Sequence, residues 1–378
     1  MTIAVVSMIR DPWGGSEELW YEMGKIALKQ GHTLIWVGYE TPTIHPKIQE
    51  LESIGLIRIS RPGWIPPSSS ELKKYFFLGR NFIRKKISSP IKKLFKCRPD
   101  ILIYNGTCYS VAGETELLQY LRQNTTTRFY IIGHLNNEFN RGIGEAEAER
   151  VRKAYHLASK VFFVSKRSLD TAKRQLATDI PNAAIVRNPV NIQSLEPLVF
   201  PPDNGIIQLA CVGNLVTIHK GQDILFEALS KWEQKDWHLN IYGTGSDKSY
   251  LENLSEYLRL QHQIKFHGRV TDIRKVWQEN HLLVMPSIME GMPLAVVEAM
   301  ICGRICIASN VGGISEWITD NKNGFLIKAP TVPLILEALE KAWSLRNSWP
   351  EISSAAHQTA LRLYDQHAGS SLLNIITE

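Results

Sequence analysis

Several features that would place this chain in a familiar class are missing. It has no run of about 18 apolar residues, so no membrane-spanning helix is predicted. Its five cysteines show neither metal-ligand spacing nor an even disulfide framework, and we therefore expect a reducing, cytoplasmic compartment. The first residues lack the basic segment and cleavage site of a signal peptide, and none is predicted. The G-x-G-x-x-G fingerprint is absent, which argues against a nicotinamide oxidoreductase.

What is present is typical of a globular protein with two domains. The chain has 378 residues, and domains commonly hold roughly 150. Apolar content of 44% and charged content of 21% are ordinary. Short apolar runs alternate with helical patterns, which predicts parallel sheets covered by helices on both faces. Residues 195–205 hold three prolines and a glycine, and this break in the alternation predicts the linker. The strands predicted are Ile3–Val6, Leu34–Val37, Ile101–Tyr104, Phe129–Ile132, Val161–Val164, Ala184–Val186, Ile206–Val212, His238–Tyr242, Ile264–Phe266, Leu282–Met285 and Ile305–Ala308.

The most informative stretch runs from Pro286 to Met300, directly after the predicted strand Leu282–Met285. Pro293 suits the first position of a helix, where its missing N–H would have no partner. The helix Leu294–Cys302 should therefore begin with free N–H groups and the positive end of its dipole. Gly291 allows a ligand to approach this backbone closely. Such a helix start favours a phosphate or a sugar hydroxyl.

Two carboxylates frame this helix start, Glu290 in the turn and Glu298 inside the helix. A carboxylate on so apolar a helix needs a partner, which is either a polar ligand or a basic side chain of the protein. The spacing resembles the E-x7-E signature of the retaining glycosyltransferases of family 4, a group 1 family, and the flanking Pro-Ser, Gly-Met-Pro and Glu-Ala-Met match as well. The resemblance spans nearly the whole chain. It implies the GT-B fold, an α/β architecture of two doubly wound Rossmann-like domains that face each other across a cleft.

The resemblance also implies a site. A nucleotide-diphosphate sugar would lie against the second domain, with Glu298 on the ribose hydroxyls and Lys220 on the diphosphate. Glu290 and the backbone after it would hold the sugar. The residues implied to bind the donor are Gly14, Gly15, Asn214, Lys220, Gly291, Met292, Pro293, Leu294 and Glu298. The residues implied in catalysis are Glu290, His134 and Lys220.

Two of these assignments lie in the first half of the chain. Gly14 and Gly15 precede a helix and resemble the family's Gly-Gly-x-Glu loop, which faces the donor, although a tight turn would equally explain two glycines. His134 follows the strand Phe129–Ile132, and the carboxyl ends of such strands carry ligand sites. It resembles the family's cleft histidine, which implies a hydrogen bond to a sugar hydroxyl rather than base catalysis.

One position departs from the family pattern. The run from Gly213 to Gly221 resembles a Gly-Arg…Lys-Gly loop, but Asn214 stands where the arginine is expected. Asparagine donates hydrogen bonds but carries no charge. Either His219 or Arg10 supplies a cation, or activity is reduced, or the donor differs. No D-x-D occurs among the eleven aspartates, so we expect no metal and no other cofactor, with fixed cations and dipoles stabilising the leaving phosphate.

Residues 73–98 hold ten Lys or Arg and no acid, against a net charge of +6 for the whole chain. Basic residues interleaved with Phe, Ile and Leu suit an amphipathic helix at an anionic membrane surface. A solvated helix with its apolar face packed on the first domain is an equal alternative. We hypothesise that the segment docks a lipid-linked or membrane-proximal acceptor. The chain shows no nucleic-acid-binding module, so no nucleic-acid partner is expected.

The sequence thus predicts a retaining, metal-independent hexosyl- or related transferase. It would move a sugar from a nucleotide-diphosphate donor to a hydroxyl acceptor in cell-envelope polysaccharide or glycolipid assembly, in the cytoplasm and at the inner face of the membrane. The acceptor-side domain would span residues 1–197, and the donor-binding domain residues 205–362. A final helix, about 365–378, would cross back to the first domain. Two alternatives stay open, a nucleotide-sugar epimerase of the same fold and a non-catalytic protein that binds sugar nucleotides.

Overall fold

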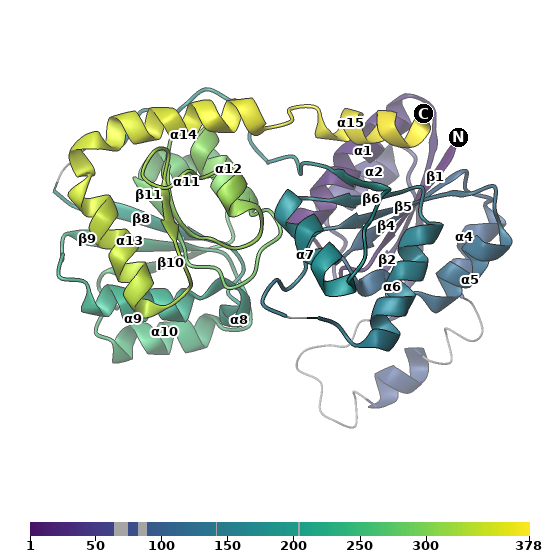
Figure 1. The fold of residues 1–378 in the computed structure, drawn as a ribbon, viewed down its shortest axis with the longest axis horizontal. Coiled ribbons are helices and arrows are strands. Elements are labelled where there is room, and N and C mark those ends of the chain that lie inside the picture. Colours follow the sequence, from purple (N-terminus) through teal and green to yellow (C-terminus); the bar gives the residue numbers. More distant parts are fainter. Residues whose placement is uncertain (64–74, 82–88, 141, 203–204) are drawn as a thin grey trace. The chain divides into compact units, whose positions relative to one another are not determined.

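The protein forms two compact units, described separately below (Figure 1). The first unit comprises Met1–Pro189 and Asp365–Glu378, and the second comprises Val190–Tyr364. The computed structural model describes five stretches of the chain, namely residues 1–63, 75–81, 89–140, 142–202 and 205–378.

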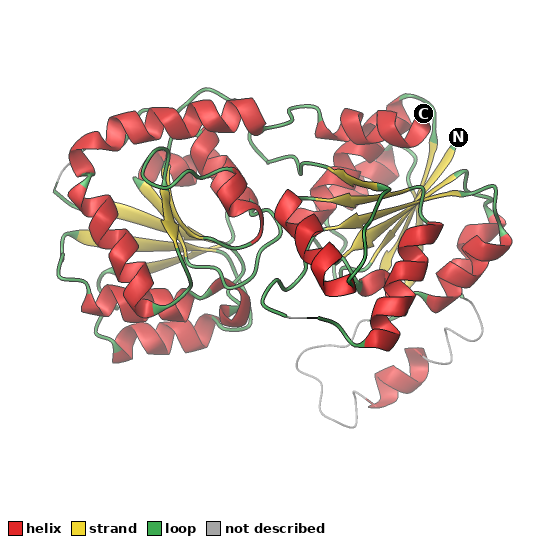
Figure 2. Ribbon diagram, viewed as in Figure 1, coloured by secondary structure: helices red, strands yellow, loops and turns green. Residues whose placement is uncertain are grey.

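The described residues of the first unit form a seven-stranded parallel sheet in the order β3-β2-β1-β4-β5-β6-β7 (Figure 2). Its central strands are apolar at nearly every position, because a parallel sheet is buried on both faces. In β1, Val5 lies between Trp36 of β2 and Ile103 of β4. The strands are β1 Thr2–Ser7, β2 Thr33–Tyr39, β3 Ile57–Arg61, β4 Ile101–Gly106, β5 Arg128–Gly133, β6 Lys160–Phe163 and β7 Ala183–Ile185.

Helices cover both faces of this sheet. Ile3 and Val5 of β1 belong to the core on the face of α1, α2 and α15, whereas Ala4 and Val6 belong to the core on the opposite face. This alternation follows from the two-residue period of a strand. Residues 75–81 are also helical. The helices are η1 Gly15–Glu17, α1 Glu18–Lys29, α2 Pro46–Ser53, α4 Pro90–Lys96, η2 Ser110–Gly113, α5 Thr115–Gln123, α6 Glu145–Leu157, α7 Lys166–Leu176 and α15 Ala368–Thr377.

The C-terminal helix α15 packs against α1 within the first unit (Figure 1). Gly369 permits the contact, because a Cβ at this position would lie 2.7 Å from the carbonyl carbon of Glu22. The hydroxyl of Tyr130 in β5 donates to the carbonyl of Ile376 at 3.3 Å. The end of the chain therefore completes the core of the unit that its beginning forms.

The described residues of the second unit form a six-stranded parallel sheet in the order β10-β9-β8-β11-β12-β13. Helix α12 packs on α14, and α13 packs on α9. The strands are β8 Ile207–Val212, β9 Trp237–Tyr242, β10 Ile264–Gly268, β11 Leu282–Met285, β12 Ile305–Ser309 and β13 Phe325–Ile327. The helices are α8 Thr217–Lys220, α9 Gln222–Lys231, α10 Lys248–Tyr257, α11 Ile273–Glu279, α12 Leu294–Ile301, η3 Gly312–Glu316, α13 Val332–Ser344, η4 Arg346–Ser348 and α14 Trp349–Leu363.

The boundary between the units falls after Pro189, ahead of the proline-rich stretch 195–205 in which the sequence predicts the linker. The described part of that stretch is bound to the second unit by two arginines. Arg274 donates to the carbonyls of Ser194 at 2.6 Å and Glu196 at 3.0 Å, and Arg304 donates to those of residues 198 and 199 at 3.2 and 2.8 Å. The prolines thus interrupt the helices and strands here, but the hydrogen bonds from the two arginines keep this segment packed on the second unit.

Candidate functional site

The stretch that the sequence singles out connects β11 to α12 in the second unit. The strand ends at Met285, and α12 begins at Leu294. Pro293 is the N-cap of α12, with φ −72° and ψ 119°, rather than its first helical residue as predicted. A proline ring allows either position because its φ suits both. The start of α12 lies where the sequence places it, and the N–H of Val296 in its first turn donates to the carbonyl of Pro293 at 3.2 Å.

Lys220 and Glu290 meet beside this turn. Lys220 ends α8, and its Nζ lies 2.5 Å from Oε1 of Glu290. The hydroxyl of Ser287 donates to the same oxygen at 2.8 Å. The Glu290 side chain is only 8% exposed, so its charge is compensated by a lysine and a hydroxyl rather than by bulk water. Ser287 was not predicted, although its place in the turn, three residues before Glu290, is a signal for such a contact.

The backbone fixes the turn against α8. The carbonyl of His219 accepts from the N–H groups of Ile288 at 2.8 Å and Met289 at 3.1 Å. Gly221 follows α8 with φ +63°, and a Cβ there would lie 2.5 Å from the carbonyl oxygen of Pro286. Only glycine combines this backbone conformation with so close an approach. The position of Lys220 relative to the turn is therefore set by main-chain contacts.

A second backbone contact fixes the other side of the turn. Gly312, at the start of η3, has φ +53°, and a Cβ there would lie 2.2 Å from the carbonyl oxygen of Glu290. The N–H of Gly313 donates to the carbonyl of Gly291 at 2.7 Å. This glycine pair therefore lies directly against the residues that the sequence assigns to the donor.

The remaining predicted residues of the second unit lie around this turn or in the loop before α8. Met292 is buried, and Glu298 is 8% exposed on the second turn of α12. Asn214 is exposed, and its carbonyl accepts from Nε2 of Gln222 at 2.9 Å. The positive charge that meets Glu290 therefore comes from Lys220 at the end of α8, and not from the loop that contains Asn214.

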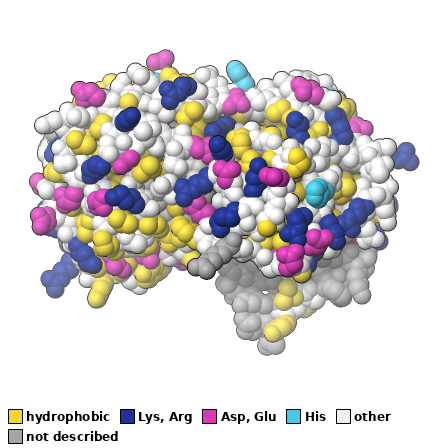
Figure 3. All heavy atoms as spheres, in the orientation of Figure 1, with side chains coloured by type: hydrophobic (Ala, Val, Ile, Leu, Met, Phe, Trp, Pro, Cys, Tyr) yellow, Lys and Arg dark blue, Asp and Glu magenta, His cyan; other side chains and the backbone are white. Residues whose placement is uncertain are grey.

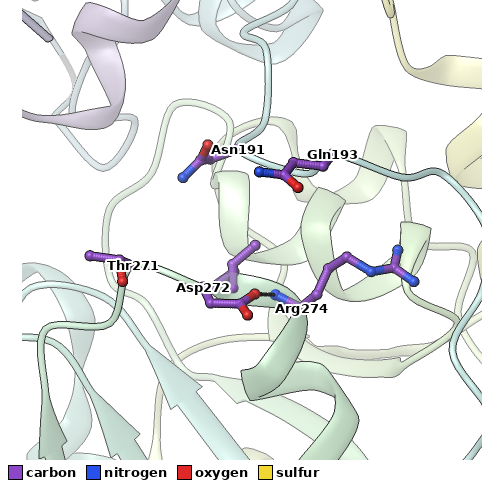
Figure 4. Close-up of a pocket in the computed structure, with 6 residues that line it drawn as sticks. Asn191, Gln193, Thr271, Asp272 and Arg274 are labelled. Carbon is purple, nitrogen blue, oxygen red and sulfur yellow. Dashed lines mark hydrogen bonds between the residues drawn. The ribbon is translucent and has the colours of Figure 1, made fainter.

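A separate pocket of the second unit lies next to the loop between β10 and α11 (Figure 4). Asn191 and Gln193 line one side, and Thr271, Asp272 and Arg274 line the other. Asp272 is the N-cap of α11 and accepts from the backbone N–H of Arg274 at 3.1 Å. None of the predicted donor-binding residues lines this pocket.

In the first unit, the residues predicted near the carboxyl ends of β1 and β5 belong to one buried network. Glu17 follows the glycine pair and is 1% exposed. Its Oε1 accepts from the hydroxyl of Ser7 at 2.9 Å and from Nδ2 of Asn105 at 2.7 Å, and its Oε2 accepts from Nε1 of Trp20 at 2.8 Å. Asn105 Nδ2 also donates to the carbonyl of Ser16 at 3.2 Å. Three donors on one buried carboxylate tie β1, β4 and η1 together.

His134 joins this network after the end of β5. Its Nε2 lies 2.8 Å from Oδ1 of Asn105, and its side chain is buried. Burial lowers the pKa of His134 to about 3, so the imidazole is neutral at physiological pH. Gly14 lies near the same strand end, where its carbonyl accepts from the N–H of Glu17 at 2.9 Å. Gly14, Gly15 and His134 are thus linked through Glu17 and Asn105.

The predicted site residues therefore form two groups, one in each unit. In the second unit the structure brings Lys220 and Glu290 into contact, whereas Gly14, Gly15 and His134 belong to the first unit. Among the described residues, no group of three or more His, Cys, Asp and Glu side chains is arranged to hold a metal ion.

Comparison with known proteins identifies the second unit. Residues 200–359 match the family model for glycosyl transferases group 1. The second unit is a group 1 glycosyltransferase domain. An uncharacterized glycosyltransferase of Haemophilus influenzae is 23% identical over 330 residues, which cover 86% of each chain. The chain is accordingly a glycosyltransferase, as the sequence predicts.

Two further comparisons concern part of the sequence and the fold of the whole chain. The transferase is 30% identical to one subunit of human phosphatidylinositol N-acetylglucosaminyltransferase over 176 residues, 44% of this chain and 34% of the human one. Its structure matches that of HepE from Anabaena, solved in complex with UDP, with a TM-score of 0.76 over all of both chains at 17% identity. The GT-B fold predicted from the sequence is thereby confirmed.

The buried carboxyl of Glu17 should make the stability of the transferase depend on pH. Burial raises the pKa of Glu17 to about 7, although the three hydrogen bonds that it accepts act in the opposite direction. A carboxyl with a raised folded-state pKa stabilises the fold below its unfolded pKa, and this contribution is lost as the pH rises through the folded value. We expect the free energy of unfolding to fall by roughly 3 kcal/mol between pH 4.5 and pH 8 on account of this group.

Urea denaturation of the wild type and of Glu17→Gln at several pH values measures this difference. The variant should lack the Glu17 part of the pH dependence, because its side chain does not ionise. Glu147→Gln, at an exposed position of α6, is the matched control and should follow the wild type. Parallel curves for the wild type and Glu17→Gln would contradict the assignment.

Proposed function

We propose that this glycosyltransferase binds a nucleotide-diphosphate sugar and transfers its sugar to a hydroxyl with retention of configuration. The observation that carries the proposal is the contact between Lys220 and Glu290 beside the start of α12. Negative charge builds on the leaving phosphate as the glycosidic bond breaks, and a fixed lysine and free helix N–H groups stabilise it. In this proposal Lys220 binds the diphosphate, Glu298 the ribose, and Asn214 adds a hydrogen bond.

Glu290 and the backbone of Gly291, Met292 and Leu294 would hold the sugar. Oε1 of Glu290 already accepts from Lys220 and Ser287, which leaves Oε2 to accept from sugar hydroxyls. The acceptor hydroxyl attacks the anomeric carbon of the sugar from the same face as the leaving phosphate. The phosphate takes the proton of that hydroxyl. No side-chain base is then required, and no metal is needed because Lys220 and the helix N–H groups carry the charge.

The relatives suggest where to look for substrates. HepE was solved with UDP, and the human relative is named for the transfer of N-acetylglucosamine to phosphatidylinositol. We therefore propose a UDP-sugar as the first donor to test, and a cell-envelope polysaccharide or a glycolipid as the acceptor class.

A thermal-shift screen against UDP-, GDP- and ADP-sugars tests donor binding. A ligand at 100 times its Kd stabilises the native state by about 2.7 kcal/mol, so the true donor should raise the Tm. Transfer assays with the best donor should proceed unchanged in EDTA, and NMR of the product should show the anomeric configuration of the donor. An inverted product, or activity lost in EDTA, would exclude the proposed mechanism. Epimerised sugar nucleotide from donor alone would identify an epimerase instead.

We also propose that the described helix 75–81 contributes to contact with an anionic membrane surface. Tyr75, Phe76 and Leu78 are 70%, 68% and 51% exposed. Elsewhere on the face shown in Figure 3, basic and acidic side chains are interspersed.

Residues 73–74 and 82–88 of the predicted basic segment lie outside the described residues. In α4, by contrast, the apolar residues 91 and 94 are buried in the first unit, as the packing alternative requires. Among the described helices, none has the length and apolar character to cross a membrane.

Sedimentation with vesicles tests this surface. The wild type should bind vesicles that contain phosphatidylglycerol and should not bind neutral phosphatidylcholine vesicles. Replacing Tyr75, Phe76 and Leu78 together by serine should abolish binding, because insertion of their side chains supplies the apolar part of the affinity. Phe139→Ser, which removes an aromatic ring that is 57% exposed elsewhere, is the control. Failure of the wild type to sediment would refute the proposal.

A further inference from the structure

Helix α8, which carries Lys220, is too short to fix its own position. It has only four residues, and isolated helices shorter than about 12 residues are marginally stable in water. At its carboxyl end, the contacts of His219 and Gly221 with the turn before α12 hold it in place. At its amino end the N-cap is Val216, and an apolar side chain cannot accept a hydrogen bond. The start of α8 therefore depends on an acceptor from another element.

Asp247, in the segment that leads from β9 into α10, supplies this acceptor. Its Oδ2 accepts from the backbone N–H of Thr217 at 2.7 Å and from the Thr217 hydroxyl at 2.9 Å. The hydroxyl of Ser246 donates to Oδ1 at 2.8 Å. These bonds, above all the one from the Thr217 N–H, lower the pKa of Asp247, so the side chain is ionised at neutral pH. One charged oxygen thus binds both donors at the start of α8.

The side chain of Asp247 serves α8 rather than the helix that it begins. Asp247 is the N-cap of α10, where an aspartate commonly accepts from N–H groups in the first turn of its own helix. It makes no such bond here, although every residue of α10 belongs to the described part of the chain. The carboxylate is instead bound to a residue 30 positions earlier. Stabilisation of α10 therefore does not explain how this side chain is oriented, whereas the support of α8 does.

The backbone before Asp247 is fixed against the segment that leads into α8. The N–H of Leu215 donates to the carbonyl of Thr244 at 3.0 Å, and the N–H of Asp247 donates back to the carbonyl of Leu215 at 3.0 Å. A Cβ at Gly243, where φ is +141°, would lie 1.9 Å from the carbonyl oxygen of Gly213, so only glycine permits this approach. Main-chain contacts therefore bring the carboxylate to the start of α8.

We propose that Asp247 is a positioning residue, which holds the start of α8 so that Lys220 at the end of this helix meets Glu290. The carboxylate binds Thr217, one helical turn follows, and Nζ of Lys220 then lies 2.5 Å from Oε1 of Glu290. Without this acceptor, α8 frays from its first residue and the lysine leaves its partner. The position of Lys220 is a property of the free protein, whereas the effect on sugar transfer rests on the proposed function.

Chemical labelling measures the position of Lys220 in the full-length free protein. Brief treatment with acetic anhydride, followed by mass spectrometry, gives the acetylated fraction of each lysine. Lys220 is 23% exposed and bound to Glu290, so it should be labelled slowly in the wild type and several times faster in Asp247→Ala. Asp236→Ala, at an exposed position before β9, is the matched control and should label as the wild type does. The exposed Lys231 should be labelled equally in all three proteins. An unchanged rate at Lys220 in Asp247→Ala would overturn the proposal even if the chain is shown to transfer sugar.

Two milder variants guard against a general loss of structure in Asp247→Ala. Asp247→Asn keeps an acceptor oxygen and should restore slow labelling of Lys220. Thr217→Val removes the hydroxyl but keeps the backbone N–H, so it should be labelled at Lys220 at an intermediate rate. If Asp247→Ala exposes Lys231 as well, Thr217→Val decides, and a wild-type rate at its Lys220 would overturn the proposal.

Sugar transfer tests the consequence of this positioning. Asp247→Ala should lower kcat/KM for the donor about tenfold, as the loss of one hydrogen bond to a charged group does, and Asp236→Ala should leave it unchanged. In a Lys220→Met background, Asp247→Ala should cause no further loss, because it acts through the lysine that is already gone. A second tenfold loss in that background would reveal a general structural role and overturn the proposal. Faster labelling of Lys220 in Asp247→Ala, together with no turnover in the wild type, would support the positioning role and count only against the proposed function.

Discussion

Lys220→Met and Glu290→Gln should each lower kcat/KM for sugar transfer by about 10²–10³, the usual cost of removing one group that stabilises transition-state charge. In the first variant the leaving phosphate loses its fixed cation. In the second the sugar loses a charged acceptor, and Lys220 loses the partner that lies 2.5 Å away. Initial rates with the donor identified by thermal shift measure both effects. The double variant should lose less than the product of the two single losses, because the side chains touch.

A surface ion pair of the same unit provides the matched control. Lys248 and Glu252 face each other across one turn of α10 at 3.3 Å, and both are largely exposed. Lys248→Met and Glu252→Gln make the same chemical changes away from the α12 turn and should keep wild-type rates. Wild-type turnover in either Lys220→Met or Glu290→Gln would remove that residue from the mechanism. Equal losses in all four variants would point to a general effect on folding.

The order of strands and helices could be read from the sequence because most strands are buried on both faces and appear as short apolar runs. The strand β3, Ile57–Arg61, was missed for the opposite physical reason. It lies at the edge of the sheet, its residues are half-buried or exposed, and Arg58 and Ser60 interrupt the apolar pattern. An edge strand pairs on one side only and needs no continuous apolar run.

The candidate site divides in a similar way. Residue types at strand ends and at a helix start could be recognised, because local sequence determines where a parallel strand stops and a helix begins. The contacts between them could not. Lys220 and Glu290 are separated by 70 positions, and Asn105 and His134 by 29. These contacts depend on which strands are neighbours in the sheet and on close backbone approaches at Gly221 and Gly312. The local sequence determines neither.

The contacts of Arg304 could not be predicted from the local sequence either, and its substitution has the largest expected effect on stability. The sequence indicates only a Gly-Arg break after a helix. In the structure the guanidinium is 0% exposed and donates to five carbonyls of the second unit, with Nε 2.5 Å from the oxygen of Trp277 and Nη2 2.8 Å from that of Val199. The remaining three, which accept from Nη1, are those of Leu198, Cys302 and Gly303. Burial lowers the pKa of Arg304 to about 10, which leaves it charged at neutral pH.

Arg304→Met should therefore lower the free energy of unfolding of the second unit by at least about 3 kcal/mol, because buried carbonyls lose a charged donor and gain no other. Arg304→Lys should recover little of this loss, since an ammonium group offers three donors from one point and cannot reach carbonyls spread around a planar fork. Urea denaturation measures both variants against Lys231→Met, an exposed position at the end of α9. The loss should also detach the stretch that contains Leu198 and Val199, so limited proteolysis should cut there in Arg304→Met before it cuts in the control. A variant with wild-type stability and an intact 195–202 stretch would show that the prolines alone hold this segment in place.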